Sequence, residues 1–188
     1  MTPPPPITVP NFLTGEAIRL LPATDDFPVS DPAVHQIVAI CNQAPVYRML
    51  FAKRLEGRPY AEEDARRFLS WAHRGWREGT HFVFLLVTDG GEVVGAADVK
   101  SADRDSAEIG YWLSEHASGV MTNALRELVR LARAAGYREL FARVRVDNLP
   151  SAGVLTRSGF AVTDHFVTEG VAYDRFAVSG QATERVAG

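Results

Sequence analysis

The stretch AEIGYWLSEHASGVMTNALRELVRLARAAGYRELFARVRV, residues 107–146, decides how the chain is expected to fold. Residues 107–113 have the pattern of a strand, and residues 139–146 alternate apolar and polar side chains like a second strand. Between them, residues 120–135 place apolar side chains on one helical face and charged side chains on the other. Gly136 then supplies a left-handed helix end. A strand–helix–strand unit of this kind joins two parallel strands by a right-handed crossover.

The sequence on either side of this unit predicts further strands and helices. Earlier strands are expected at residues 16–23, 81–88 and 92–100, with the turn Asp89-Gly90-Gly91 joining the last two. Earlier helices are expected at residues 31–42, 45–52 and 58–78. After the unit we expect a helix at residues 149–158 and strands at residues 160–167 and 171–178. Together these elements predict one α/β domain with a mixed sheet.

Length and composition set the limits of that domain. The 188 residues carry a formal net charge of -3 and one cysteine, which fits a single domain without disulfides. We expect residues 1–11 to be a disordered, proline-rich leader, in preference to a ligand for a proline-binding module. Residues 179–188 are expected to be a flexible tail. The sequence shows no secretory signal and no run of about 18 apolar residues, so we expect a cytoplasmic location and no membrane partner.

The start of the central helix carries the first candidate for a binding site. Ser118 and Gly119 precede the helix, where free backbone N–H groups and the helix dipole favour an anion. A glycine there lets a phosphate approach the backbone closely. The same residues equally fit an ordinary helix start with Ser118 as N-cap. The chain has neither GxxxxGK[ST] nor GxGxxG after a strand, so no P-loop or dinucleotide fold is indicated.

The other residues that can carry chemistry favour structural roles. The five histidines lack metal-ligand spacing, and Cys41 lies on an apolar helical stretch typical of buried packing. The chain has 20 Lys and Arg residues against 23 Asp and Glu residues, which is no footprint for a nucleic-acid surface. We therefore expect neither a metal site nor direct binding of nucleic acid.

Three segments resemble the acetyl-CoA-binding half of the GNAT acyltransferase superfamily, in its RimJ/RimL-like branch. They are AEIGYWL (residues 107–113), SGVMTNAL (residues 118–125) and NLPSAGVLTRSGF (residues 148–160). FLTGEAIRLLPA (residues 12–23) is similar to the opening strand of that branch. The resemblance therefore covers residues 12–178, which we take as the N-acetyltransferase domain. It implies a mostly antiparallel sheet in which two parallel strands splay apart around the pantetheine arm of acetyl-CoA.

The resemblance also implies a cofactor site. Its residues in this sequence are Trp112, Leu113, His116, Ser118, Gly119, Val120, Met121, Thr122, Asn148 and Ser151. The superfamily loop is usually [QR]xxGx[GA], so His116 stands in place of Arg or Gln and Met121 in place of a small residue. Many members place a tyrosine acid in the last helix, where this chain has Leu155. The Asn-x-x-Ser pattern passes that acid role to Ser151.

Glu108 is the candidate general base. Strand alternation places Glu108 on one face with Gly110 and Trp112, and a glycine within a strand often marks the close approach of a ligand. Glu108 also matches a catalytic glutamate of several superfamily members. The alternative is a surface carboxylate at a strand start. Asn148, likewise, fits either the cofactor site or the N-cap of the following helix.

The acceptor is expected to be a primary amine, on a protein N-terminus or a small molecule. The aromatic residues Trp71, Trp76, Trp112 and Tyr111, with residues 47–60, are candidates for the acceptor cleft or for the core. The leading hypothesis is an acetyl-CoA-dependent N-acetyltransferase, monomeric or homodimeric, that transfers the acetyl group directly in a ternary complex. The alternatives are a non-catalytic acyl-CoA-binding or interaction module with the same fold, and a phosphate-binding α/β domain outside this family.

Overall fold

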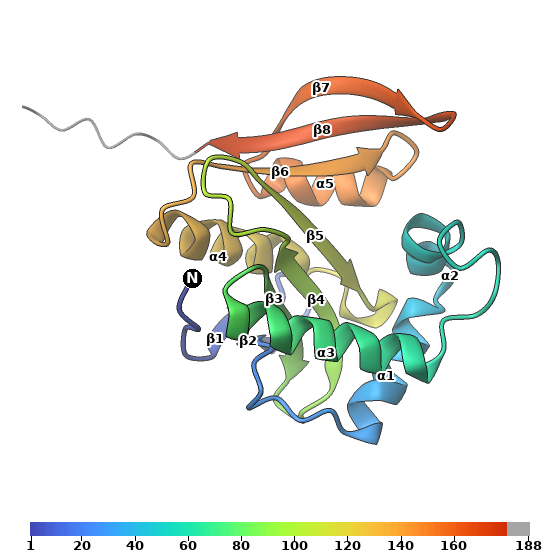
Figure 1. Ribbon diagram of the computed structural model, residues 1–188, viewed down its shortest axis with the longest axis vertical. Helices are drawn as coiled ribbons and strands as arrows, with labels where there is room; N and C mark the ends of the chain where they lie inside the picture. The colour runs from blue at the N-terminus through green and yellow to red at the C-terminus, as the bar shows by residue number, and fades with distance from the viewer. Residues whose placement is uncertain (180–188) are drawn as a thin grey trace, which may run out of the picture.

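The fold is organised around one eight-stranded sheet, seen in a computed structural model that describes residues 1–179 (Figure 1). Its strands are β1 (Ile7–Pro10), β2 (Ala17–Pro22), β3 (Phe82–Thr88), β4 (Val93–Val99), β5 (Ala107–Leu113), β6 (Glu139–Arg145), β7 (Ala161–Thr168) and β8 (Val171–Ser179). They lie in the order β1-β2-β3-β4-β5-β6-β8-β7. Neighbouring strands pair antiparallel except β5 and β6, which are parallel. The predicted mixed sheet with one parallel pair is confirmed.

The helices cover both faces of this sheet (Figure 1). They are α1 (Asp31–Cys41), α2 (Ala44–Val46), the π-helical turn η1 (Tyr47–Phe51), α3 (Glu62–Glu78), the 3₁₀ turn η2 (Glu115–Ala117), α4 (Met121–Ala134) and α5 (Leu149–Arg157). Helices α4 and α5 pack against one face, while α1 and most of α3 pack against the other. Within residues 1–179, no helix is both long and apolar enough to cross a membrane.

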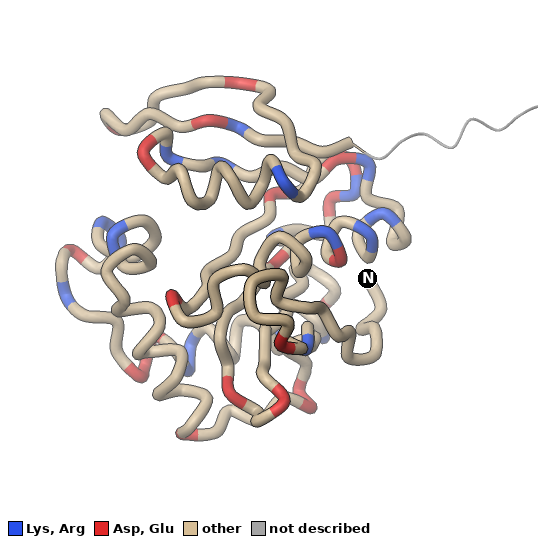
Figure 2. Tube along the Cα trace, turned by 180° about the vertical axis from the view of Figure 1, so that it is seen from behind, with Lys and Arg blue, Asp and Glu red and all other residues tan. Residues whose placement is uncertain are grey.

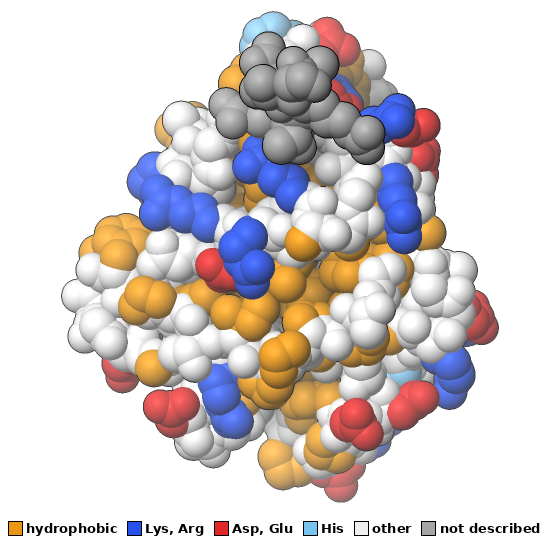
Figure 3. Space-filling view, turned by 90° about the vertical axis from the view of Figure 1, so that its left-hand side faces the viewer, with side chains coloured by type: hydrophobic (Ala, Val, Ile, Leu, Met, Phe, Trp, Pro, Cys, Tyr) orange, Lys and Arg blue, Asp and Glu red, His pale blue; other side chains and the backbone are white. Residues whose placement is uncertain are grey.

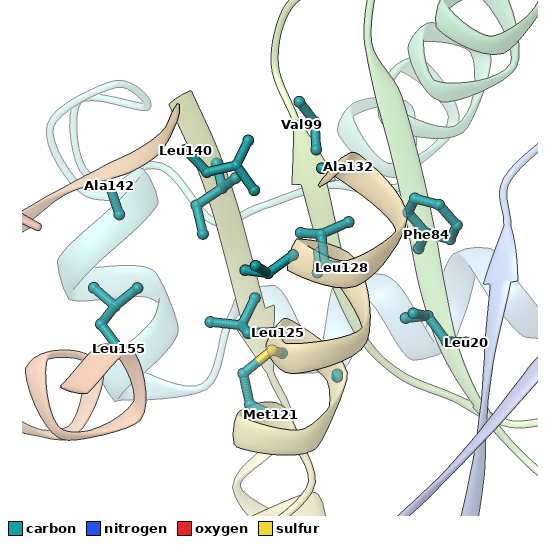
Figure 4. Packing of buried hydrophobic residues seen from close by; sticks show 14 of the residues in the cluster. Leu20, Phe84, Val99, Met121, Leu125, Leu128, Ala132, Leu140, Ala142 and Leu155 are labelled. Atoms are coloured by element: carbon teal, nitrogen blue, oxygen red, sulfur yellow. The ribbon is translucent and has the colours of Figure 1, made fainter. Parts of the chain in front are cut away.

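The crossover helix α4 supplies much of the first core. Its apolar stripe, with Leu125 and Leu128 completely buried, meets Leu20, Phe84 and Val99 of the sheet (Figure 4). Helix α5 adds Leu155, also completely buried. The predicted amphipathic pattern of α4 is therefore confirmed, because its apolar side chains are the ones that reach the sheet.

A second core lies on the opposite face. Val83 and Leu85 of β3 and Ala96 of β4 pack there against Ile37 of α1 and Leu69 of α3. Strand β3 is buried on both faces, which explains its unbroken apolar sequence FVFLLV. Cys41 is buried in this core, as its apolar surroundings predicted.

Two predicted helices differ from the structure, one in where it begins and one in being divided. Helix α3 begins at Glu62 instead of residue 58, because the Asp64 carboxylate accepts the Ala61 backbone N–H and closes the helix start there. The helix predicted at residues 45–52 is divided into α2 and η1. Gly136 and Gly159 follow α4 and α5 with positive φ angles of 90° and 92°, as predicted for left-handed helix ends.

The N-terminal boundary of the domain differs more clearly. Residues 7–10 were expected in a disordered leader, yet they form β1 and pair with β2. The Asn123 side chain on α4 donates to the Pro10 carbonyl at 2.7 Å, and the Asn11 side chain donates to the Ser118 carbonyl at 3.0 Å. These contacts anchor residues 7–11 in the folded domain. Of the predicted tail, Ser179 belongs to β8, and residues 180–188 lie outside the described residues.

Charged residues of both signs are distributed over the chain (Figure 2). The face in Figure 3 has hydrophobic side chains across its middle, with basic and acidic side chains around them. This mixture agrees with the small formal net charge of -3.

Gly119 links the N-terminal loop to the start of α4, which gives a stability prediction. Its φ is +107°, and a Cβ there would lie 2.2 Å from Asn11 Oδ1 and 2.9 Å from Leu13 Cγ. Gly119→Ala should therefore carry backbone strain of about 1–3 kcal/mol and a further overpacking cost of about 1–3 kcal/mol. Gly159→Ala is the matched control, since φ is +92° and no heavy atom lies within 4 Å of the added Cβ.

Chemical denaturation of both variants measures the difference. The free energy of unfolding should fall more for Gly119→Ala than for Gly159→Ala. Equal losses would mean that the contact of Gly119 with the N-terminal loop contributes nothing.

Candidate active site

The parallel pair β5–β6 opens into a cavity. The two seven-residue strands are paired at Ala107 with Leu140 and at Glu108 with Phe141, and no further pair forms within the described residues. Beyond Glu108 the strands diverge, and a cavity of about 670 Å³ lies between them. Its walls come from β5, β6, the start of α4, helix α5 and the α2–η1 segment. The cavity therefore contacts elements from both faces of the sheet.

Most of the predicted site residues line this cavity. They are Glu108, Trp112, Leu113, Ser118, Gly119, Met121, Thr122, Asn148 and Ser151. His116 and Val120 are not brought to it. His116 is exposed on η2, and Val120 is completely buried in the core beneath α4. The substitution of His for the usual Arg or Gln therefore changes no side chain in the lining.

The start of α4 differs from the predicted cap. Ser118 does not cap this helix, because its hydroxyl donates to the Glu115 carbonyl at 2.9 Å. Val120 is the N-cap residue, and no side chain in residues 1–179 forms a cap hydrogen bond at this end. The first-turn N–H groups of Met121 and Thr122 are thus left without a side-chain acceptor beside the cavity. Free N–H groups at a helix start, together with the helix dipole, generally favour an anion.

The role of Gly119 in this loop differs from the predicted one, which was to let a phosphate approach the backbone. The side on which a Cβ would project is occupied by Asn11 and Leu13. Its missing side chain therefore admits the N-terminal loop, and the Phe12 N–H donates to the Gly119 carbonyl at 3.4 Å. The requirement for glycine at this position follows from that packing and from the positive φ.

A pair of hydroxyl groups lies between β5 and α5. Asn148 caps α5 by accepting the Ser151 N–H at 3.3 Å, which confirms the predicted N-cap. The Tyr111 hydroxyl donates to the Ser151 carbonyl at 3.1 Å and also contacts the Ser151 hydroxyl. Burial raises the pKa of Tyr111 to about 12, so this phenol stays protonated at neutral pH and can donate hydrogen bonds.

Tyr111 is the donor that sequence reasoning did not assign. The tyrosine sought in the last helix is replaced by Leu155, which is completely buried in the core. The position of Tyr111 on β5 could have indicated this role, because alternation along the strand places its side chain on the face that α5 covers. What the sequence did not show was that Ser151 would lie within hydrogen-bonding distance.

Glu108 lies between two basic side chains at the edge of the cavity. Lys100 Nζ lies 2.8 Å from its Oε1, and an Arg143 guanidinium nitrogen lies 2.6 Å from its Oε2. Burial acts to raise the pKa of Glu108, but the hydrogen bonds and charges of Lys100 and Arg143 outweigh it and lower the pKa below its ordinary value. This carboxylate is ionised at neutral pH and is a weakened base.

The aromatic candidates separate into two groups. Tyr111 and Trp112 line the cavity, together with Arg48 and Met49 from the predicted 47–60 region. Trp112 packs against Phe68 of α3, with ring centroids 5.8 Å apart. Trp71 stacks on His81, and the Trp76 indole donates to the Val83 carbonyl at 2.7 Å. Trp71 and Trp76 therefore serve the packing of α3.

Basic side chains contribute to the cavity in a way that the sequence did not indicate. Its lining includes Lys100 and the arginines Arg48, Arg143, Arg145 and Arg157. Four different segments supply these residues, so only the folded chain gathers them. Arg130 and Arg133, in contrast, lie on the solvent face of α4, as predicted.

Comparison with known proteins gives this arrangement a context. The sequence matches the Acetyltransferase (GNAT) domain family over residues 22–161. It is 30% identical over 105 residues to the ribosomal-protein-serine acetyltransferase of Escherichia coli (strain K12), covering 53% of this chain. That match spans 58% of the relative, which is less than two thirds of its length.

Solved structures share the whole fold. Mycobacterium smegmatis RimJ in complex with CoA-disulfide has a TM-score of 0.72 at 22% identity, covering 100% of this chain and 93% of that one. RimL, a ribosomal L7/L12 alpha-N-protein acetyltransferase in complex with coenzyme A, has a TM-score of 0.71 at 22% identity. That alignment covers 92% of this chain and 98% of the RimL chain. With its domain match, its mixed sheet and its splayed parallel pair, the chain belongs to the GNAT acetyltransferase family.

Proposed function

We propose that this protein transfers the acetyl group of acetyl-CoA to a primary amine. The observation that carries the proposal is the cavity between β5 and β6, with the uncapped start of α4 beside it. Support also comes from the family match and from relatives that are described as acetyltransferases or as complexes with coenzyme A.

The residues present fit acetyl-CoA. The gap beyond the pair Glu108–Phe141 matches an extended pantetheine arm, because both strands there offer unpaired backbone groups. The N–H groups of Met121 and Thr122 suit a pyrophosphate. When bound, the cofactor supplies an acetyl thioester. Leu113 and Met121 give the cavity apolar wall, and Asn148 holds the first turn of α5 in place.

The two faces of β5 supply different groups to the reaction. Tyr111 and Ser151 lie on the face covered by α5, where their hydroxyls can donate to a departing thiolate. Glu108, Gly110 and Trp112 alternate to the other face of β5, where the acceptor amine would enter the cavity that the α2–η1 segment also lines. Because the cavity contacts both faces, donor and acceptor can be held together, which favours direct transfer in a ternary complex.

The acceptor is an amine on a protein N-terminus or on a small molecule. The relatives named for ribosomal proteins favour a protein N-terminus. An α-amine has an ordinary pKa of about 7.7–8.0, against about 10.4 for lysine, so it needs less help to lose a proton. We therefore place a peptide α-amine first among the acceptors to be tested.

The direct test pairs binding with turnover. Acetyl-CoA and free CoA should each raise the melting temperature of the protein, whereas ATP should not. A panel of peptides and small amines should then release free thiol from acetyl-CoA in the presence of the protein. Stabilisation by CoA without thiol release from any amine would indicate a binding module instead of an enzyme, and a response to ATP alone would contradict the CoA site.

The hydroxyl pair gives a second prediction. Ser151→Ala should lower kcat by about 10²-fold, because the departing sulfur loses its proton donor. Tyr111→Phe should lower kcat by a smaller factor, since Ser151 remains. Thr156→Ala is the matched control, because its hydroxyl lies on the same helix and bonds the Ala152 carbonyl.

Steady-state kinetics with a saturating amine measure these effects. The control should keep the wild-type kcat. If Ser151→Ala keeps both kcat and the KM for acetyl-CoA, Ser151 is neither the donor nor a cofactor contact.

A further inference from the structure

A second carboxylate, Asp98 on β4, lies directly beside the cavity wall. Asp98 pairs with Gly110 of β5, which lines the cavity. Because cross-strand partners project to the same face, the Asp98 side chain is on the face of Glu108 and Trp112. A Cβ at Gly110 would stand 3.2 Å from both Asp98 carboxylate oxygens. The absence of a side chain at residue 110 therefore leaves this carboxylate next to the space that the acceptor would enter.

The carboxylate is only partly satisfied by the fold, in which the Gly110 backbone N–H hydrogen-bonds to it. Asp98 Oδ1 is buried and has no hydrogen-bond partner in residues 1–179. Burying a polar group without a partner costs free energy, so native structures keep few such groups. Asp98 as a residue is only partly buried, although its Oδ1 is enclosed. Asp98 does not itself line the cavity, but its unpartnered oxygen lies behind Gly110, which does.

The surroundings of Asp98 set it apart from Glu108. The charged neighbours are Lys100, directly after β4, and Glu108 on β5, and Arg143 of β6 contacts Glu108. On the β3 side the paired residue is Val83, which is apolar. Burial raises the pKa of Asp98 to about 6, against the attraction of the Lys100 ammonium. The pKa of Glu108, which contacts two cations, is lowered instead.

Two neighbouring carboxylates whose pKa values are shifted in opposite directions have different chemical uses. A base is most effective when its pKa lies near the working pH, because it is then both free and able to hold a proton. Glu108 remains ionised and holds Lys100 and Arg143 in place across β4, β5 and β6.

We propose that Asp98 is the catalytic base of the acetyl transfer, reaching the acceptor amine across Gly110, and that Glu108 is a positioning residue. This inference rests on the proposed function. As a neutral amine nitrogen forms its bond to the acetyl carbonyl carbon, it passes one proton to Asp98. The carbon–sulfur bond breaks, its electron pair leaves on sulfur, and sulfur takes a proton from Ser151. Asp98 then loses its proton to water and Ser151 regains one, which yields the amide and the free thiol.

Asp98→Asn tests the assignment, with Glu108→Gln as the comparison. Asp98→Asn should lower kcat by about 10²-fold with an unchanged KM for acetyl-CoA, because the base is lost and the cofactor site is not. Glu108→Gln should cost less in kcat and should keep the wild-type dependence of kcat on pH near 6. Thr156→Ala again serves as a control.

The stability of Asp98→Asn gives a readout that does not depend on turnover. A carboxyl whose pKa is raised in the folded protein destabilises it as the pH rises from about 4, the unfolded value, through the folded value. Asp98→Asn should therefore have a higher melting temperature than the wild type at pH 7.5, and that advantage should shrink at pH 5. A carboxyl ¹³C resonance that titrates near pH 6 in the wild type should be missing from the variant.

Gly110→Ala is a second test variant, for the case in which Asp98→Asn does not fold. Its Cβ would stand 3.2 Å from both Asp98 carboxylate oxygens and 2.8 Å from Lys100 Cε, which crowds the carboxyl without removing it, so kcat should fall. A wild-type kcat in Asp98→Asn or in Gly110→Ala would overturn the inference. An inactive wild type over the whole amine panel would instead overturn the proposed function.

Discussion

The divergence of β5 from β6 is the constraint on which the rest of the site depends. Two parallel strands of seven residues are held together at two residue pairs and then separate, which leaves backbone groups without partners. Such an opening is stable only if both strands are fixed from outside. Strand β5 is held by its antiparallel partner β4, and β6 is held by β8 over seven pairs, Glu139 to Arg145. Helix α4 connects the two strands and packs beneath them with Leu125 and Leu128 (Figure 4).

The opening also explains how one strand serves two kinds of chemistry. Alternation along β5 sends Tyr111 toward α5 and Ser151, and sends Glu108 and Gly110 toward Asp98 and Lys100. The proposed donor for the leaving group and the proposed base for the acceptor therefore come from opposite faces of β5. The side chains that gather at the cavity come from segments between residues 12 and 173, so the complete fold is needed to assemble the site.

The periodicity of the sequence was sufficient to predict seven of the eight strands, the crossover helix and the parallel pair. It was sufficient because apolar side chains repeat at helical spacing in α4 and fill β3 without interruption. Local rules were less informative at element ends. Strand β1 lies in a short segment between prolines, and only its pairing with β2 and the contact of Asn123 with Pro10 reveal that it is folded.

Site residues that belong to a sequence motif could be predicted. Site residues that are brought together only by contact between strands could not. Asn148 and Ser151 follow from their own local pattern, and most of the predicted loop residues lie at the cavity. Asp98 has no motif. Its proposed role rests on its register with Gly110 and on an oxygen left without a partner, and neither can be read from the sequence alone. Ser118 was wrong as an N-cap because its hydroxyl turns back to Glu115.

The proposed function requires that the gap between β5 and β6 receives the thioester arm and that the start of α4 receives the pyrophosphate. Backbone hydrogen exchange of the protein with and without a non-transferable thioether analogue of acetyl-CoA tests it most directly. The analogue is expected to slow exchange in two segments together, residues 109–113 of β5 and residues 118–122 before and within α4. Protection that appears elsewhere, or in neither of these segments while the analogue binds, would contradict it.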